Sequence, residues 1–465
     1  SSDVCSSDLE EQEAIQLSRA MSQEQKFEMM TEAPIPGLIG RLAVPTIISM
    51  LITSFYNMAD TFFVGKIGTS ATAAVGVVFP VMAIIQALGF FCGHGSGNSI
   101  SRHLGSKDVQ SARELASTGF FLAFALGTLL MVLGLVFLDP LSHLLGSTKT
   151  IFPYTRDYLR FILLGAPYMT AQLVLNNQLR FQGNAFYAMI GITSGGVLNV
   201  ILDPIFIFVF DLGISGAAIA TILSQFVSFC LLLVGLRVSK CIPIHLRNVR
   251  LTIPRLREIV GGGLPSLFRQ GLGSIATTTL NIAANPYGDA AIAAMSVVSR
   301  IMMFANSALI GFGQGFQPVC GFNYGAGRND RVREAFWFCV KVSTAVLLGL
   351  AVLGGFLSGH LIWIFRNDPD VIQIGTTALR FQCVTFALNG WIIMNNMMMQ
   401  TMGKTVPATI LAASRQGLFF IPALLILPQF LGLTGIQCAQ AVSDVFTFAL
   451  TTLLNRKVMR SLNNR

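Results

Sequence analysis

Residues 214–236 read ISGAAIATILSQFVSFCLLLVGL, a run of 23 residues without Asp, Glu, Lys or Arg. A helix needs about 20 predominantly apolar residues to cross the hydrocarbon core of a bilayer. Runs at 115–138, 342–365 and 416–443 meet the same condition. Membrane β-strands would alternate apolar and polar residues, and these runs are continuous. The stretch therefore predicts a membrane-spanning helix.

The composition of the whole chain agrees with this interpretation. Of 465 residues, 53% are hydrophobic and only 11% are charged, and the mean hydropathy is +0.65. Soluble domains carry about 25% charged residues, so a water-facing surface cannot be built from this chain. The composition also excludes a disordered protein, a coiled coil and a disulfide scaffold. The eight Cys are scattered and have no His at ligand spacing, so neither disulfides nor a metal site is predicted.

The apolar runs predict an all-α polytopic membrane protein with twelve transmembrane helices. The predicted helices lie near 39–64, 72–100, 115–138, 159–180, 186–210, 214–236, 259–283, 291–317, 335–358, 374–400, 406–430 and 436–455.

The distribution of basic residues predicts the orientation in the membrane. On the side of the two termini, loops and tail hold eighteen Lys and Arg, Arg180 among them, whereas the opposite loops hold four. Basic loops stay in the cytoplasm, so we expect a multi-pass protein of the cell inner membrane with both termini cytoplasmic. The net charge of +9 is thus explained by the basic loops that set the orientation in the membrane. We therefore expect the lipid bilayer as a partner and no nucleic acid.

The chain also repeats itself. Sliding it by 220 residues aligns Pro45 with Pro265 and Gly68 with Gly288, and gives fourteen identities over the 70 positions 45–114. Six helices per repeat make the two halves parallel, which is a transporter architecture. We expect an N-lobe at 36–236 and a C-lobe at 259–455, joined by a basic cytoplasmic linker at 237–258 and followed by a cytoplasmic tail at 456–465.

The first 35 residues are predicted to be a cytoplasmic segment. Residues 1–9, SSDVCSSDL, form a near-duplicated polar string that resembles a sequencing-adapter artefact, and we exclude it from fold reasoning. The stretch Glu10–Met30 is amphipathic and could form a short helix.

Two carboxylates fall inside predicted helices of the first half. Asp60 lies in SFYNMADTFFVG and Asp203 in GVLNVILDPIF, four residues after Asn199. This spacing places the amide and the carboxylate on one helix face, and Thr221 of the next helix adds a hydroxyl. Burial favours the protonated carboxyl, so we expect these four side chains to bind a proton or Na⁺. The alternative is that both acids cap helix ends and face interfacial water.

Further charged residues lie inside helices of the second half. Arg269, Arg300 and Arg415 are each about ten residues from a helix end, so they should line a cavity or brace the fold by pairing with a carboxylate or carbonyls. Asp444 is a third acidic candidate.

Several motifs do not carry catalytic chemistry. MGKT at 402–405 lacks the upstream Gly of a phosphate loop, and GHGSGN at 93–98 and GFGQGF at 311–316 fall at equivalent positions of the repeat. The latter two are typical of close helix packing. Without an ATPase motif or a catalytic constellation, we expect no enzyme and no cofactor besides a coupling ion, H⁺ or Na⁺.

The segments YNMADTFFVGKIG, GVLNVILDPIF, GAAIAT and GFGQGFQPVCGFNYGAG resemble the multidrug and toxic compound extrusion (MATE) family over roughly 36–455. The similarity is to its DinF-like branch, which includes bacterial multidrug exporters such as those that contribute to antibiotic resistance. The resemblance implies a V-shaped pair of six-helix lobes that exports cationic amphipathic drugs or dyes in exchange for H⁺ or Na⁺, and we expect it to function as a monomer.

The resemblance also implies roles for particular residues. Asp60, Asn199, Asp203 and Thr221 match the N-lobe cation site of the branch, and Pro45 matches a proline associated with bending of the first helix. Another branch uses acids in helices seven and ten. Here those stretches hold Arg269–Gln270 and Asn395–Asn396, which favours the N-lobe site.

Two alternatives remain open. A lipid-linked saccharide flippase of the related superfamily would need a strongly cationic central cavity, to which Arg269, Arg300 and Arg415 could contribute. A polytopic acyltransferase would need a His or Cys constellation that the sequence does not display.

Overall fold

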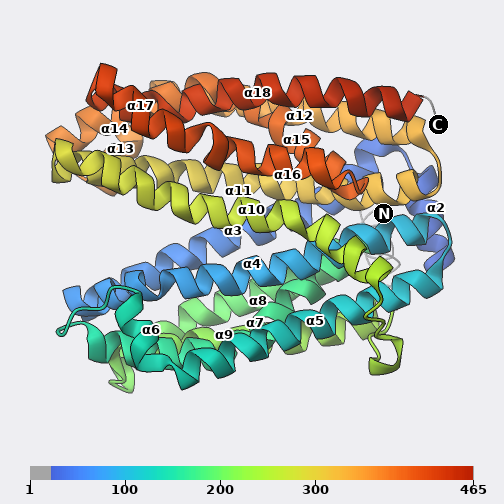
Figure 1. Ribbon diagram of the computed structural model, residues 1–465, viewed down its shortest axis with the longest axis horizontal. Coiled ribbons are helices and arrows are strands. Elements are labelled where there is room, and N and C mark those ends of the chain that lie inside the picture. Colours follow the sequence, from blue (N-terminus) through green and yellow to red (C-terminus); the bar gives the residue numbers. More distant parts are fainter. Residues whose placement is uncertain (1–21, 464–465) are drawn as a thin grey trace, which may run out of the picture.

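The computed structural model describes residues 22–463, which are helical throughout their regular elements and contain no β-strand. The predicted segment 1–9 and the first part of the amphipathic stretch lie outside the described residues. The helices run roughly parallel to one long axis (Figure 1). Short α2 and the last turn of α18 lie at one end, called here the α2 end, and the short helices α6 and α13 lie at the opposite end.

From residue 22 onward, the first half of the chain forms eight α-helices and one π-helical turn. Their bounds are α2 Gln23–Glu32, α3 Ile35–Ile67, α4 Thr69–Gly105, α5 Val109–Val136, α6 Leu138–Leu144, α7 Phe152–Phe181, α8 Ala185–Pro204, η1 Ile205–Val209 and α9 Gly213–Val238.

The second half repeats this arrangement with more interruptions. A 3-10 turn, η2 Leu246–Asn248, precedes it, and the elements are α10 Ile253–Ala284, η3 Asn285–Tyr287, α11 Asp289–Gly325, α12 Asn329–Phe356, α13 Ser358–Phe365, α14 Pro369–Phe386, α15 Leu388–Thr401, α16 Thr405–Ala413, the π-helical turn η4 Ser414–Leu418, α17 Phe420–Leu431 and α18 Leu433–Asn463.

Each of the twelve predicted spans is helical, and the predicted fold class is confirmed. Within the described residues, nine helices are by themselves long and apolar enough to cross a membrane, and the bent pair α14–α15 adds a tenth. The other two, α10 and α18, contain Arg269 and Asp444. The break of 56° between α14 and α15 was not predicted from the continuous apolar run at 374–400.

Equivalent glycines turn the chain in both halves. Gly68, between α3 and α4, has φ of 150°, and Gly288, between α10 and α11, has φ of 93°. These backbone conformations are rarely adopted by residues with a side chain. The internal repeat therefore aligns two turns that need glycine for the same physical reason.

The two halves contact each other through glycines near the α2 end. A Cβ atom on Gly262 of α10 would lie 3.1 Å from the Cα of Gly95 in α4, and one on Gly315 of α11 would lie 2.5 Å from the Cα of Ala43 in α3. Gly95 and Gly315 belong to the two motifs at equivalent repeat positions. They let helix backbones of opposite halves approach closely.

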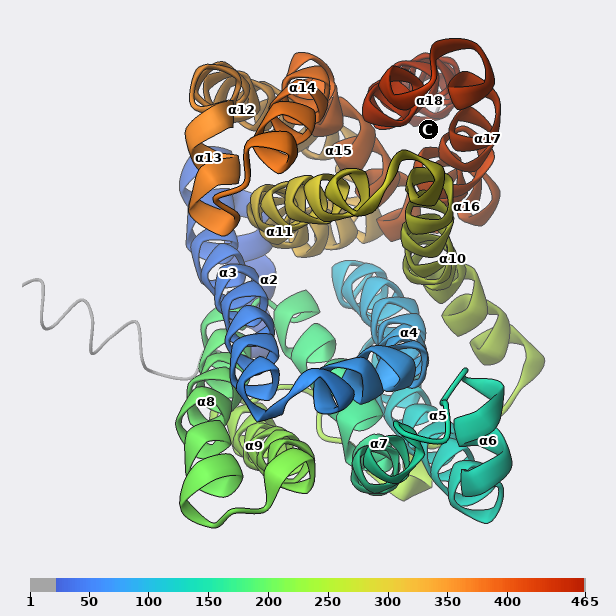
Figure 2. The same cartoon turned by 90° about the vertical axis from the view of Figure 1, so that its left-hand side faces the viewer.

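Toward the opposite end the halves diverge, and the molecule is V-shaped (Figure 1). Gly271 and Gly273 of α10 have no heavy atom within 4 Å of an added Cβ. Figure 2, which looks onto this opposite end, shows α3, α4 and α7–α9 below and α10–α18 above. The contact between halves is thus concentrated at the α2 end.

Helix α2 spans both halves at the closed end. The amine of Lys26, which is buried, donates to the carbonyl of Ser239 at 2.8 Å, and burial lowers the pKa of Lys26. On the other side, Arg331 of α12 donates to the carbonyl of Ala33 at 2.6 Å. A capping box at Ser22 begins this helix.

Candidate functional site

The carboxylate of Asp203 lies in the interior of the first half. Asp203 has no exposed surface and Asn199 only 1%, and the Asn199 amide donates to Asp203 Oδ1 at 3.3 Å. Both residues are in α8, one turn apart, so the helical spacing alone aligns them. Pro204 follows, and the chain then changes to the π-helical turn η1. Pro204 has no backbone N–H to continue the α-helical pattern.

Asp60 of α3 faces Asp203 across the interface of α3 and α8. The two carboxyl groups are within hydrogen-bonding range of each other. Two ionised carboxylates are acceptors only, so they can form this bond only when one of them carries a proton. Like charges at this separation also repel each other strongly in a low dielectric. The pair therefore needs a positive charge to be stable.

The oxygen atoms around this pair lack partners in the described structure. Asp60 Oδ1, Asn199 Oδ1 and Asp203 Oδ2 are each buried without a hydrogen-bond donor. Among the ion pairs formed by residues 22–463, none includes Asp60 or Asp203. Buried acceptors without donors are costly. A proton shared by the two carboxyl groups satisfies two of these oxygens, and a hard cation that prefers oxygen ligands can contact all three.

The other predicted member, Thr221 of α9, is 6% exposed. Its hydroxyl donates to the carbonyl of Ala217 in the same helix at 3.0 Å, so its lone pairs remain as acceptors. Two tyrosines were missed: Tyr56 and Tyr158 both interact electrostatically with Asp60. Tyr56 precedes Asp60 by four residues, the same spacing that linked Asn199 to Asp203, and could have been found by it.

Pro45 lies inside α3, which continues through it from Ile35 to Ile67. One residue later, the hydroxyl of Thr46 donates to the carbonyl of Gly311 in the other half at 2.6 Å. The proline therefore stands where α3 contacts α11. A bend at this point would change the contact between the halves.

The three arginines of the second half have different surroundings. Arg269 donates to the Asn396 side chain at 3.2 Å and to the Ser266 hydroxyl at 3.3 Å. Arg300 is exposed. The charge of Arg415 is neutralised by an ion pair that is described next. The three side chains therefore do not form the strongly cationic central cavity that a flippase would need.

Arg415 forms an ion pair with Asp444. Arg415 Nε lies 2.8 Å from Asp444 Oδ1, and Asp444 is 2% exposed. Gln440 donates to the same oxygen at 3.0 Å and Thr385 to Oδ2 at 3.4 Å. This carboxylate accepts from three side chains, and its ion pair with Arg415 braces α18 against η4. It differs in this respect from Asp203.

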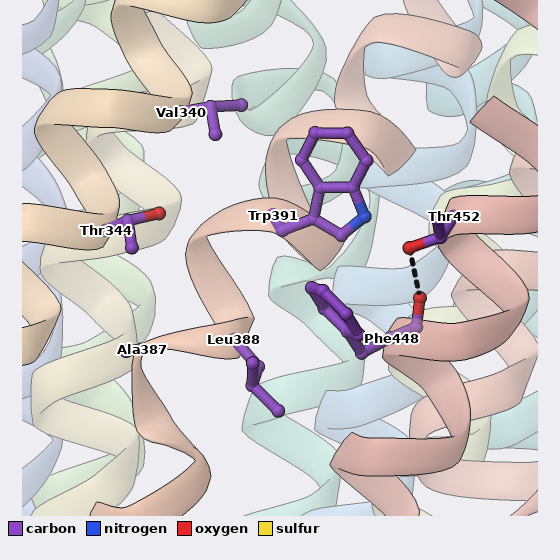
Figure 3. Close-up of a pocket in the computed structure, with 7 residues that line it drawn as sticks. All are labelled: Val340, Thr344, Ala387, Leu388, Trp391, Phe448 and Thr452. Atoms are coloured by element: carbon purple, nitrogen blue, oxygen red, sulfur yellow. Dashed lines mark hydrogen bonds between the residues drawn. The ribbon is translucent and has the colours of Figure 1, made fainter. Parts of the chain in front are cut away.

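A cavity of about 430 Å³ lies between α12, α15 and α18. Figure 3 shows the rings of Trp391 and Phe448 facing it, with Leu388 below. The hydroxyl of Thr452 donates to the carbonyl of Phe448, so its proton is not free to donate to a ligand there. The cavity is apolar and contains none of the predicted site residues.

Comparison with known proteins agrees with this arrangement. Residues 45–205 and 265–425 each match the MatE family, and the starts and the ends of the two matches both differ by 220, the offset of the internal repeat. The chain belongs to the MatE family.

Relatives of this MatE protein extend over nearly its full length. It is 30% identical to the "Multidrug export protein MepA" of Staphylococcus saprophyticus over 438 residues, which cover 93% of this chain and 96% of the relative. A solved structure described as "MATE in complex with MaL6" superposes with a TM-score of 0.89 at 27% identity, covering 95% and 100% of the two chains. An outward-facing "multidrug resistance MATE family transporter" superposes with a TM-score of 0.88 at 27% identity, covering 94% and 98%.

Proposed function

We propose that this MatE protein is a secondary active transporter that exports cationic amphipathic drugs or dyes in exchange for H⁺ or Na⁺. The observation that carries the proposal is the pair Asp60–Asp203 inside the first half. One buried oxygen of each carboxyl group and that of Asn199 lack donors, and no Lys or Arg among residues 22–463 forms an ion pair with either acid. The multidrug export protein MepA, similar over 93% of this chain, supports the substrate class.

Exchange follows from the electrostatics of this pair. With the coupling ion absent, two carboxylates keep α3 and α8 apart and attract a cationic compound. When H⁺ or Na⁺ binds among the oxygens of Asp60, Asn199 and Asp203, one of the two negative charges is neutralised, the repulsion between the carboxyl groups is removed, and α3, α8 and α9 pack more tightly. The cationic compound then loses its electrostatic partner and leaves. The ion and the drug thus compete for the same charge.

The direction of transport depends on orientation. With both termini in the cytoplasm, as the basic loops predict, the α2 end is cytoplasmic and the open end faces outward. The described arrangement is then the state that releases drug and loads the coupling ion. We further propose that one chain, in the inner membrane, is sufficient.

The proposal is tested by dye efflux from proteoliposomes in which a proton gradient and a sodium gradient are imposed separately. Ethidium should move against its own gradient when one of the two ion gradients is present, and not when both are collapsed. Ethidium movement that is the same with and without either gradient would overturn the proposal.

A further inference from the structure

Arg180 is a buried arginine whose guanidinium forms no ion pair with an Asp or Glu of the described residues. It lies in the last turn of α7 and is 1% exposed, although its place near a helix end suggested a basic loop residue. Its Nη2 donates to Asn177 Oδ1 at 2.5 Å and its Nη1 to Gln317 Oε1 of the other half at 3.4 Å. Its Nε has no partner.

A second guanidinium lies nearby. Arg269 of α10 and Arg180 act on each other electrostatically, and both act on the ring of His94 in α4. The His94 ring is 3.0 Å from the Ser266 hydroxyl, which also accepts from Arg269. These side chains come from both halves, where α4 and α10 face each other (Figure 2).

No carboxylate of the described residues compensates these charges. No ion pair there includes Arg180 or Arg269; their hydrogen-bond partners are neutral amides and a hydroxyl, and the Arg180 guanidinium also lies over the ring of Phe181, 4.7 Å from its centroid. Arg255, by contrast, is paired with Glu114 at 3.0 Å and with Glu258 at 3.1 Å. Arginine does not lose its proton in proteins, so the two positive charges persist.

The free hydrogen-bonding atoms of Arg180 and its partner are donors. Besides Arg180 Nε, the amide Nε2 of Gln317 is buried without an acceptor, and Gln317 is 1% exposed. An isolated buried charge and unsatisfied donors are both costly. A bound anion would both neutralise the charge and accept from these donors.

The cluster formed by Arg180, Arg269 and Gln317 lies beside the opening between the two halves. Gly262 of α10 is at the close contact with Gly95, and Arg269 follows it by seven residues, about 10 Å along the helix. Gly271 and Gly273, just beyond, have open space around them. Arg269 is half-buried. The cluster therefore lies where the contact between the halves ends and the opening begins.

We propose that Arg180 and Arg269, together with Gln317, form an anion-binding site at the floor of the opening between the two halves. The ligand is a carboxylate or a small inorganic anion such as chloride or phosphate. This anion is either a group of the exported compound or a free ion from the surrounding solution. In the first case the proposal rests on the exporter function and extends its substrates to zwitterionic amphipaths.

The test compares a cationic rhodamine methyl ester with its zwitterionic free acid in proteoliposomes. Variants Arg180→Gln and Arg269→Gln should export the free acid at least about tenfold more slowly, because a charge-assisted hydrogen bond contributes about 1.5–3 kcal/mol, and should retain export of the ester. Arg269→Lys should rescue part of the loss. The control Arg237→Gln, at the exposed last turn of α9, should change neither rate.

An inorganic anion gives a different pattern. Replacing chloride by methanesulfonate, which is neither a carboxylate nor a small inorganic anion, on both sides would then slow both dyes equally in the wild-type protein and leave the two Gln variants unaffected. An unchanged ratio of acid to ester export in both Gln variants, with no effect of methanesulfonate on the wild-type protein, would overturn the proposal.

A measurement on the wild-type protein covers the case in which the variants do not fold. Its thermal unfolding midpoint in detergent should rise with chloride, phosphate or the free-acid dye relative to methanesulfonate, since a ligand of the folded state stabilises it. Equal midpoints in all four would contradict the site. Failure of the exporter proposal is distinct, because it would appear as no gradient-driven efflux even of the ester.

Discussion

Asp203 of α8 and Asp60 of α3 place their carboxyl groups within hydrogen-bonding range inside the first half, and neither is paired with a Lys or Arg in the described chain. The carboxylate of the second half, Asp444, is instead held by Arg415 at 2.8 Å. The two halves share a fold and an internal repeat, but within residues 22–463 only the first offers an acidic pair with unsatisfied oxygens.

Replacing Asp60 by Asn removes one of the two charges. The remaining carboxylate attracts a cation less strongly and no longer needs a shared proton, so gradient-driven ethidium efflux should fall at least about tenfold, as for loss of one charged interaction. The rate is measured in proteoliposomes. Asp139→Asn, an exposed acid paired with Arg156, is the control. Equal rates for the two variants would contradict a role for Asp60.

Replacing Asn199 by Ala removes the amide that donates to Asp203 and one free oxygen. If the driving ion is Na⁺, its concentration for half-maximal exchange should rise, because one oxygen ligand is lost; if it is H⁺, the concentration should fall, because the ionised carboxylate of Asp203 loses a donor. A hydrogen bond to a charged group contributes about 1.5–3 kcal/mol, so the change should be about tenfold in either case, while the maximal rate stays near that of the wild-type protein. Titration of the driving ion measures both quantities. A lower maximal rate with unchanged ion dependence would assign Asn199 a purely structural role.

Replacing Gly315 by Val disturbs the contact of the two halves at the α2 end. The added side chain meets the backbone of Ala43, and such overpacking costs about 1–3 kcal/mol, so the population with a separated α2 end should increase. Cys320, buried next to this contact, should then react faster with a maleimide, as followed by peptide mass spectrometry. Gly271→Val, with open space around it, should leave the labelling rate of Cys320 unchanged.

Replacing Asp444 by Asn leaves Arg415 without its counter-charge. Loss of one partner of a buried pair costs about 3–5 kcal/mol, and we expect a value near the lower limit because the Arg415 side chain is 17% exposed. The thermal unfolding midpoint should fall, and the double variant Arg415→Leu/Asp444→Leu should recover much of it. Ion coupling should persist in both. A double variant no more stable than the single one would argue against a bracing pair.

Much of the fold could be predicted because it follows from local pattern. Continuous apolar runs indicated the twelve helices, and identities at an offset of 220 indicated the two halves. The break between α14 and α15 could not be predicted, because no proline or charge interrupts the run near Ala387. It depends on packing between helices.

The same distinction applies to the site. Asn199 and Asp203 are one turn apart, so their proximity is a property of the helix. The contact of Asp60 with Asp203, and that of Arg415 with Asp444 across 29 residues, depends on how helices pack. Arg180 was assigned to a basic loop because it ends a helix, but the other half covers it. Burial by a distant segment leaves no signal in the local sequence.

The most direct test of the central claim is ethidium efflux by the Asp203→Asn variant. Asparagine keeps the size of the side chain and loses the charge, so the variant should fold and insert normally, with the elution profile and unfolding midpoint of the wild-type protein. In proteoliposomes with an imposed proton or sodium gradient, its efflux should fall to the rate of protein-free vesicles. Efflux at the wild-type rate would contradict the account.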